Sequence, residues 1–326
     1  METLPFLGAN ISRRGFLTGA TTGAALLAIP LPAAGAETAR KVLRLGGPIF
    51  VKSQDPEVLA RAHRDLGYRA AYAPELKLSD SDMIRATREA FARHDVILAE
   101  VGAWSNLLDS DGGKREKNFH FVRDQLALAE ELGARCCVDL AGSYNPTVWY
   151  GPDIRNIGKE FQDATVENVR KLLDDVKPKR TKFSIEMSPW NIPTGAAEYL
   201  SLIKAIDRTA FGAHVDVTNI INSPYRMYRN GMVIEDCLQK LAPWVVSCHV
   251  KDLKWEIGLP DTVRFRETVP GRGMIDFRAC LRGMSNLPND VPLMIEHLES
   301  EEAYNQGRRH IQEVAESMGL SLEAAS

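Results

Sequence analysis

The stretch LMIEHLES, residues 293–300, begins as a buried β-strand, because Leu293, Met294 and Ile295 follow one another without a polar residue. Glu296 then stands where another apolar residue is expected. A charged carboxylate that is buried without a partner is strongly unfavourable, so Glu296 needs a partner. Seven further apolar runs in the chain predict the fold and suggest what that partner is.

These runs are short and rich in apolar or β-branched residues, and each ends in turn or polar residues. The eight runs begin near residues 41, 68, 96, 135, 182, 212, 244 and 291. Stretches with the spacing of amphipathic helices lie between them, several of which open with Asp or Ser at the N-cap position. Eight strand–helix units over residues 37–326 predict an α/β fold, a single-domain (β/α)8 TIM barrel.

The alternative fold is a doubly wound open sheet. Such a sheet usually carries a G-x-G-x-x-G sequence directly after its first strand. Here the first run is followed only by Gly46-Gly47-Pro48, which does not fit that pattern. The barrel is therefore the preferred prediction.

The first 36 residues have a different character. SRRGFL, residues 12–17, contains an arginine pair and precedes a mildly apolar stretch that ends in the small residues Ala34-Gly35-Ala36. This pattern is typical of a cleaved twin-arginine export signal, with a disordered amphipathic N-terminus as the alternative. We therefore expect residues 1–36 to be a signal peptide, recognised by the twin-arginine export machinery. The mature protein would begin near Glu37 and be periplasmic or otherwise exported.

Composition narrows the range of partners. The 326 residues carry a net charge of −3 and no basic run, which argues against nucleic acid or a membrane surface as partner. No clean apolar run in the mature chain is long enough to span a membrane. The five cysteines are an odd number without metal-site spacing, so we expect no disulfide framework. The composition is also compatible with a homo-oligomer.

Polar residues end the last four strand-like runs. They are Glu186, Asp216, His249 and Glu296. In a (β/α)8 barrel the active site lies at the C-terminal ends of the strands. The apolar residue before each of the four would face the helices, so strand alternation turns all four toward the barrel axis.

Three carboxylates crowded at one point repel one another unless a cation holds them. Together with one imidazole they suit a single divalent metal ion: Mn²⁺ is the first choice, with Mg²⁺, Co²⁺ and Zn²⁺ as alternatives. Each residue alone could instead be a loop cap, a surface ion pair or a packed core histidine. Taken together, they make a metal the predicted partner of Glu296.

The order Glu…Asp…His…Glu, with HVKD at 249–252 and VPGRGMIDF at 269–277, resembles the xylose-isomerase-like sugar isomerase/epimerase family. The resemblance extends over residues 41–316. In the ketose 3-epimerases of this family, the glutamates that match Glu186 and Glu296 bind the metal and also exchange a substrate proton. The resemblance therefore implies that these two residues are catalytic as well as metal-binding.

Three further residues are predicted to contact the substrate. Asn219 stands where those epimerases carry a histidine, Lys251 has the inward parity of His249, and Arg272 lies in the glycine turn. A solvated lysine or arginine is the alternative for the last two. Three tryptophans could stack on a sugar face or serve only in packing. They are Trp104, Trp149 and Trp190.

The predicted function is a metal-dependent isomerase or epimerase that acts on a free sugar, keto-sugar or cyclitol through an enediolate intermediate. The alternative is a lyase or dehydratase that uses the same metal site on a keto-sugar, cyclitol or 3-keto-glycoside. A non-catalytic exported sugar-binding protein is a third reading. A nuclease of the endonuclease IV kind, which needs three zinc ions, is disfavoured because the chain has only seven histidines.

Overall fold

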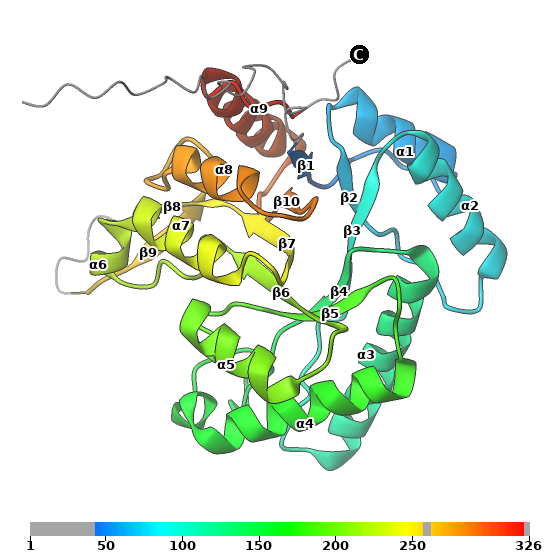
Figure 1. Ribbon diagram of the computed structural model, residues 1–326, viewed down its shortest axis with the longest axis vertical. Helices are drawn as coiled ribbons and strands as arrows, with labels where there is room; N and C mark the ends of the chain where they lie inside the picture. The colour runs from blue at the N-terminus through cyan, green and yellow to red at the C-terminus, as the bar shows by residue number, and fades with distance from the viewer. Residues whose placement is uncertain (1–42, 257–261, 323–326) are drawn as a thin grey trace, which may run out of the picture. The chain divides into compact units, whose positions relative to one another are not determined.

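A computed structural model describes residues 43–256 and 262–322. Eight parallel strands close into a barrel in the order β1-β10-β7-β6-β5-β4-β3-β2 (Figure 1). The barrel strands are β1 (Arg44–Gly46), β2 (Ala70–Tyr72), β3 (Ile97–Gly102), β4 (Cys136–Asp139), β5 (Lys182–Glu186), β6 (Phe211–Asp216), β7 (Val245–Val250) and β10 (Pro292–Ile295). Because β1 pairs with both β2 and β10, the sheet has no open edge. The predicted (β/α)8 barrel is confirmed, whereas the proposed export signal at 1–36 lies outside the described residues.

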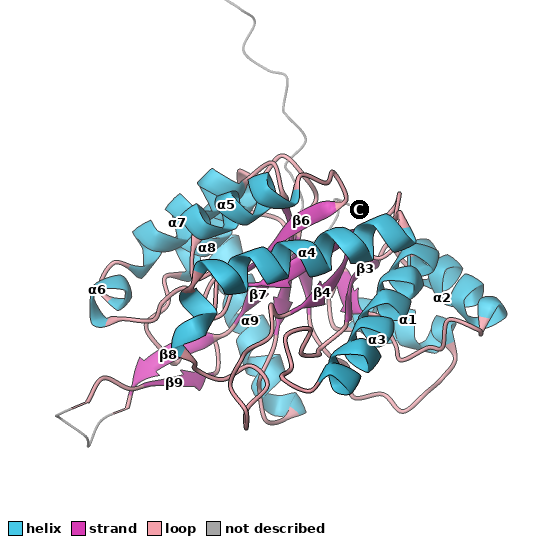
Figure 2. Ribbon diagram, turned by 90° about the horizontal axis from the view of Figure 1, so that it is seen from below, coloured by secondary structure: helices cyan, strands magenta, loops and turns pink. Residues whose placement is uncertain are grey.

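Helices surround the strands (Figure 2). The long ones are α1 (Pro56–Asp65), α2 (Ser81–Arg93), α3 (Gly112–Leu132), α4 (Lys159–Val176), α5 (Ala196–Ile206), α7 (Asn230–Leu241), α8 (Phe277–Ser285) and α9 (Glu301–Ser317). Two single-turn elements are the 3₁₀ helix Ile154–Ile157 and α6 (Pro224–Met227). Side chains of Asp55, Asp111, Asp276 and Ser300 accept bonds from backbone N–H groups at helix N-termini. These caps satisfy donors that have no partner within the helix. None of the described helices is both long and apolar enough to cross a membrane.

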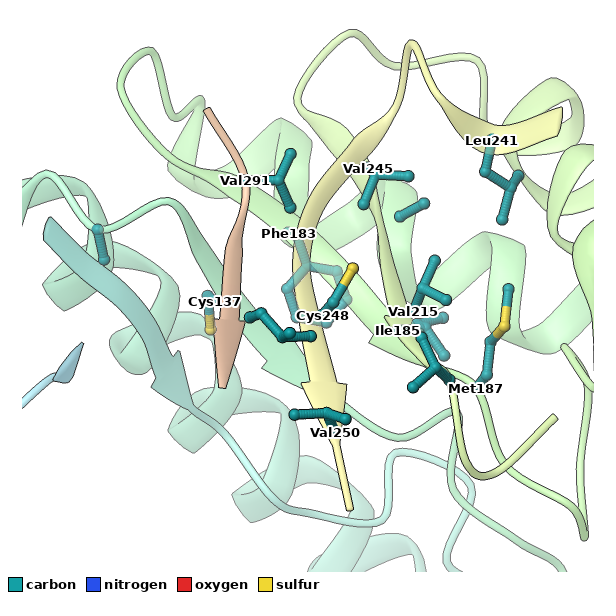
Figure 3. Close-up of a cluster of buried hydrophobic side chains, with 14 of the residues drawn as sticks. Cys137, Phe183, Ile185, Met187, Val215, Leu241, Val245, Cys248, Val250 and Val291 are labelled. Atoms are coloured by element: carbon teal, nitrogen blue, oxygen red, sulfur yellow. The ribbon is translucent and has the colours of Figure 1, made fainter. Parts of the chain in front are cut away.

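Strand alternation orders the core as predicted. The residues directly before the four strand-end polar residues are at most 1% exposed and belong to the main apolar cluster. They are Ile185, Val215, Cys248 and Ile295. Helix side chains such as Tyr199 and Leu238 belong to the same cluster. Figure 3 shows several of these strand residues together. The opposite parity, which includes the four polar residues, therefore faces the barrel axis.

The long connection after β7 contains an antiparallel hairpin. It pairs β8 (Asp252–Trp255) with β9 (Phe265–Thr268) and projects from the barrel (Figure 2). Rings of Trp255 and Phe265 lie 4.8 Å apart, and the ring of Tyr228 lies 5.7 Å from that of Trp255. These contacts join the outer end of the paired strands to Tyr228, the residue after α6.

Candidate active site

The structure brings the four strand-end residues together. Each of Glu186, Asp216, His249 and Glu296 offers one ligand atom, and these atoms all lie within 4.8 Å of one another. All four are buried, with at most 9% of their surface exposed. They come from β5, β6, β7 and the residue after β10, which are consecutive strands of the closed barrel. The sequence prediction that they converge is therefore met by the geometry, while their role as ligands remains a prediction.

Lys251 lies inside this group of carboxylates. It has no exposed surface, its Nζ donates to Asp216 Oδ2 at 2.5 Å, and it also donates to Glu296. Burial opposes its charge, but the neighbouring carboxylates outweigh burial and raise the pKa of Lys251 well above its usual value. The side chain is thus a buried ammonium ion at the site, as its inward parity predicted, and not a solvated lysine.

His249 contacts carboxylates through both ring nitrogens. Its Nδ1 lies 3.2 Å from Glu186 Oε1 and 3.0 Å from Glu296 Oε2. Its Nε2 lies 2.6 Å from Oε1 of Glu100, a residue of β3. Burial opposes protonation of this imidazole, but the three carboxylates prevail and raise the pKa of His249.

Glu100 is a residue of the site that sequence reasoning missed. Its other oxygen, Oε2, lies 3.0 Å from His214 Nε2 and accepts from Ser247 Oγ at 3.1 Å. Burial alone would raise the pKa of Glu100, but His249 and His214 lower it below the usual range. Glu100, His214 and His249 form a second compact group next to the first, with His249 common to both. A carboxylate that bonds the outer nitrogen of a metal-binding histidine fixes the tautomer and orientation of that ring.

Asp216 shows how closely the carboxylates are crowded. Burial, together with the charges of Glu296 and Glu186, raises its pKa to about 7 against the opposing effect of Lys251. Its Oδ1 accepts from the backbone N–H groups of Thr218 and Asn219, at 2.8 and 3.0 Å. These bonds fix the carboxylate at the strand end in spite of the repulsion.

Asn219 and Arg272, the other two residues predicted to contact the substrate, differ in their distance from the site. Asn219 donates from Nδ2 to Glu186 Oε1 at 3.2 Å and to the carbonyl of Met187, so it is at the site and orients Glu186. Arg272 is more distant, because it donates to Gln306 Oε1 of α9 and lines a hollow beside Glu296.

The tryptophan candidates differ in their distance from the site. The ring of Trp104 is 6.5 Å from that of His249, and the ring of Tyr72 is 6.2 Å from it. Trp149 instead packs edge-on against Tyr150, with ring centroids 5.2 Å apart. Trp104 therefore has the position required of a stacking platform, whereas Trp149 makes an aromatic pair on its own loop.

Three buried asparagines join the loops at one side of the site. Asn106 accepts from the backbone N–H of Ser143 at 3.0 Å and donates to its carbonyl at 2.8 Å. Asn191 donates to the carbonyl of Gly142, and Asn156 to that of Trp190. The loops at 103–111, 140–158 and 187–195 therefore form one hydrogen-bonded wall, which carries Trp104 and Trp190.

A second pair of side chains extends the site toward the β8–β9 hairpin. His297, which adopts a left-handed backbone with φ of 56°, lies 3.5 Å from Glu296 Oε2 through Nε2. Its Nδ1 lies 3.1 Å from Glu267 Oε2, and Glu267 Oε1 lies 3.8 Å from Lys251 Nζ. Strand alternation alone would turn His297 away from the barrel axis, but with its left-handed backbone the ring lies beside Glu296.

The residues present fit a divalent metal ion. Three carboxylates and one imidazole nitrogen converge from rigid strand ends, and these are the ligand types that Mn²⁺, Mg²⁺, Co²⁺ and Zn²⁺ accept. Held by hydrogen bonds against their mutual repulsion, the carboxylates form a strongly anionic centre that Lys251 and His249 only partly balance. Glu186, Asp216, His249 and Glu296 would hold the ion, and Glu100 would hold His249.

The sequence matches the family model described as xylose isomerase-like TIM barrel over residues 60–314. The match spans most of the chain, so the protein belongs to the xylose isomerase-like TIM barrel family. No curated protein matches the sequence significantly.

Several solved structures share the fold. A xylose isomerase-like TIM barrel protein from Mycobacterium smegmatis in complex with magnesium is 18% identical, with a TM-score of 0.58, over 80% of this chain and 88% of that one. Endonuclease IV from Thermus thermophilus is 16% identical, with a TM-score of 0.62, over 84% and 99% of the two chains. The 3-keto-D-glucoside 4-epimerase YcjR from E. coli is 11% identical, with a TM-score of 0.61, over 84% and 99%. Because one neighbour is a nuclease and another an epimerase, the likeness establishes the fold alone.

Proposed function

We propose that the protein is a metal-dependent isomerase or epimerase that acts on a free sugar, keto-sugar or cyclitol through an enediolate of the substrate. The cofactor in this proposal is one divalent ion, with Mn²⁺ as the first choice. The magnesium complex of a family member and the sugar epimerase among the similar structures are in keeping with it. A nuclease is not favoured, because the groups that could hold a metal among the described residues contain only the histidines His249 and His214, and a three-zinc site needs more.

One observation carries the proposal. Glu186 and Glu296 stand on β5 and after β10, on either side of the strands that carry Asp216 and His249, and both contact His249 Nδ1. Two carboxylates thus approach one point from opposite sides. This is the arrangement that removal of a proton from one face of a carbon and its return to the other face requires.

Each residue then has a defined task. A bound divalent ion would polarise a substrate carbonyl and lower the pKa of the adjacent C–H. Glu186, oriented by Asn219, takes or gives a proton on one face, and Glu296 does so on the other. Lys251 places an ammonium group beside Glu296, where it can donate a hydrogen bond to a substrate oxygen that gains negative charge.

The test uses the protein loaded with Mn²⁺ and two substitutions, Glu186→Gln and Glu296→Gln. Glutamine keeps a carbonyl oxygen for the metal but cannot act as a base. We expect both variants to keep the ion while turnover falls by about two to four orders of magnitude. Exchange of substrate C–H protons with D₂O, followed by NMR over a panel of sugars and 3-keto-sugars, would identify the carbon that each residue serves.

The matched control is Glu235→Gln, because Glu235 forms a surface ion pair with Arg282 on α8, away from the site. Its turnover should equal that of the unaltered protein. If a variant of Glu186 or Glu296 retains normal turnover with metal bound, that residue is a ligand only and is not the base.

A lyase or dehydratase acting on a keto-sugar, cyclitol or 3-keto-glycoside is the second candidate. The contact of Lys251 with both Asp216 and Glu296 favours it, because a buried ammonium group can protonate a departing oxygen. Analysis of the products distinguishes the two reactions. Elimination releases water or an alcohol and gives a new C=C bond, whereas epimerisation conserves the molecular formula.

A further inference from the structure

A hollow of about 450 Å³ lies beside the candidate metal site. It is bounded by β9, the turn that carries Arg272 and the N-terminal part of α9. The hollow adjoins the candidate site directly, because two of its lining residues contact residues of the site. His297 lies 3.5 Å from Glu296, and Glu267 lies 3.8 Å from Lys251.

The lining is polar and carries charges of both signs. Its three cationic side chains are those of Lys254, Arg266 and Arg272. Its three carboxylates are those of Glu267, Glu299 and Glu302. The apolar lining residues are few, and none of them is aromatic; among the residues that line the hollow, His297 alone has an aromatic ring. The lining therefore offers both hydrogen-bond donors and acceptors, which suits a group with many hydroxyls and not an apolar ring.

Two of the cations have no evident structural purpose. Lys254 and Arg266 face each other as register partners on the hairpin, a like-charged pair that destabilises a two-stranded sheet. Within the described part of the chain, neither has a carboxylate partner at ion-pair distance. Both side chains line the hollow, so their donors can bond to a molecule that occupies it.

We propose that this hollow is a second sugar subsite, so that the natural substrate is a glycoside. The reacting ring lies over the carboxylates of the proposed function, on which this inference rests, and the second, neutral ring lies between β9 and α9. The volume falls within the range of roughly 300–1,000 Å³ that is typical of small-molecule sites.

The test compares the binding of D-fructose with that of maltulose, a disaccharide in which one glucose unit is attached to fructose. Isothermal titration with the Mn²⁺-loaded protein should show maltulose binding at least about tenfold more tightly. The double variant Lys254→Ala/Arg266→Ala should reduce this ratio to nearly one. Arg264→Ala is the matched control, because Arg264 lies on the same hairpin and does not line the hollow, so it should leave the ratio unchanged.

Each outcome decides the matter. Equal affinity for the two sugars overturns the second subsite while leaving the proposed function intact, since D-fructose still binds. Tighter binding of maltose 1-phosphate than of maltose, lost in the double variant, would identify an anion site and also overturn the proposal. If neither sugar binds and no sugar exchanges protons with D₂O, the proposed function falls first and the subsite falls with it.

Discussion

The imidazole of His249 touches carboxylates at both of its nitrogen atoms, and this sets the chemistry of the site at the scale of single residues. Nδ1 faces the point where a metal would bind, and Nε2 faces Glu100. The Glu100 carboxylate is almost completely buried and has three polar partners around it. It therefore acts through His249 as a positioning residue.

Replacing Glu100 by glutamine should weaken metal binding without removing a ligand. The amide keeps the size of the side chain, but its NH₂ group cannot accept a bond from His249, His214 or Ser247. Loss of such a supporting carboxylate typically lowers metal affinity about 10–100-fold. Titration with Mn²⁺ would measure the change against Glu235→Gln, and equal affinity in the two variants would show that Glu100 does not position the ring.

Metal affinity should also depend on pH. Asp216, whose pKa burial raises to about 7, and His249, whose pKa three carboxylates raise, must both be deprotonated to bind an ion. Affinity is therefore full only above these raised pKa values and falls as the pH decreases through them, by about tenfold per pH unit for each proton released. Calorimetric titration in two buffers of different ionisation enthalpy would count the protons. Identical heats in both buffers would contradict the prediction.

At the scale of elements, the two sequence motifs HVKD, residues 249–252, and VPGRGMIDF, residues 269–277, contact each other. Asp252, the last residue of HVKD, accepts four backbone N–H bonds, from Leu253, Gly271, Gly273 and Ile275. A Cβ atom on Gly273 would lie only 2.2 Å from the Asp252 carboxylate, so a side chain has no room there. The glycine turn thus wraps around the Asp252 carboxylate. Together, Asp252 and the turn fix the base of the hairpin that lines the proposed subsite.

Asp252→Asn should test this wrapping. The new NH₂ group would face two N–H donors and could accept from neither, so we expect a loss of about 2 kcal/mol in the free energy of unfolding. Urea denaturation would measure it. Asp236→Asn is the control, because the exposed Asp236–Lys240 pair should contribute less than about 0.5 kcal/mol. A loss no greater than in the control would mean that the turn forms without Asp252.

The sequence predicted the barrel strands and the four converging residues because both follow from local pattern. Alternation places Ile185 and Val215 outward and so brings Glu186 and Asp216 inward. Glu100 carries the same signal as Glu296, a carboxylate within an apolar strand, but it lies in the middle of β3 and not at a strand end. The pairing of β2 with β3 also shifts register between Ala71 and Tyr72, next to Glu100, and such irregularities cannot be derived from spacing.

The hairpin and the turned-back His297 were missed for different reasons. Strands β8 and β9 have only four residues each, two of which are charged in each strand, so no apolar run marks them. His297 departs from alternation through its positive φ, a conformation that a residue other than glycine seldom adopts. Both features depend on contacts between segments far apart in the sequence.

At the scale of the whole molecule, the site depends on closure of the barrel. Glu186, Asp216 and His249 come from strands that are neighbours in sequence order, but Glu296 reaches them only because β10 pairs with β7. Glu100 reaches His249 from β3, on the opposite side of the barrel. An incompletely closed sheet would therefore contain neither the ligand cluster nor its support.

We propose that the protein leaves the cytoplasm in this folded form, with the arginine pair Arg13-Arg14 as the export signal. Substituting both arginines by lysine should keep the precursor inside the cell, because lysine retains the charge but not the guanidinium group. Fractionation and immunoblotting would compare the periplasmic and cytoplasmic pools, with Arg40→Lys as a control outside the signal. Export that continues at the normal rate would show that the pair is not a targeting signal.

Lys251 gives this molecule a built-in counter-ion. Its ammonium group already lies against Asp216 and Glu296, so positive charge stands among the buried carboxylates without any bound ion. We therefore expect the barrel to be able to fold without a metal. The ion that we propose would then be selected by a finished site and not by a folding chain.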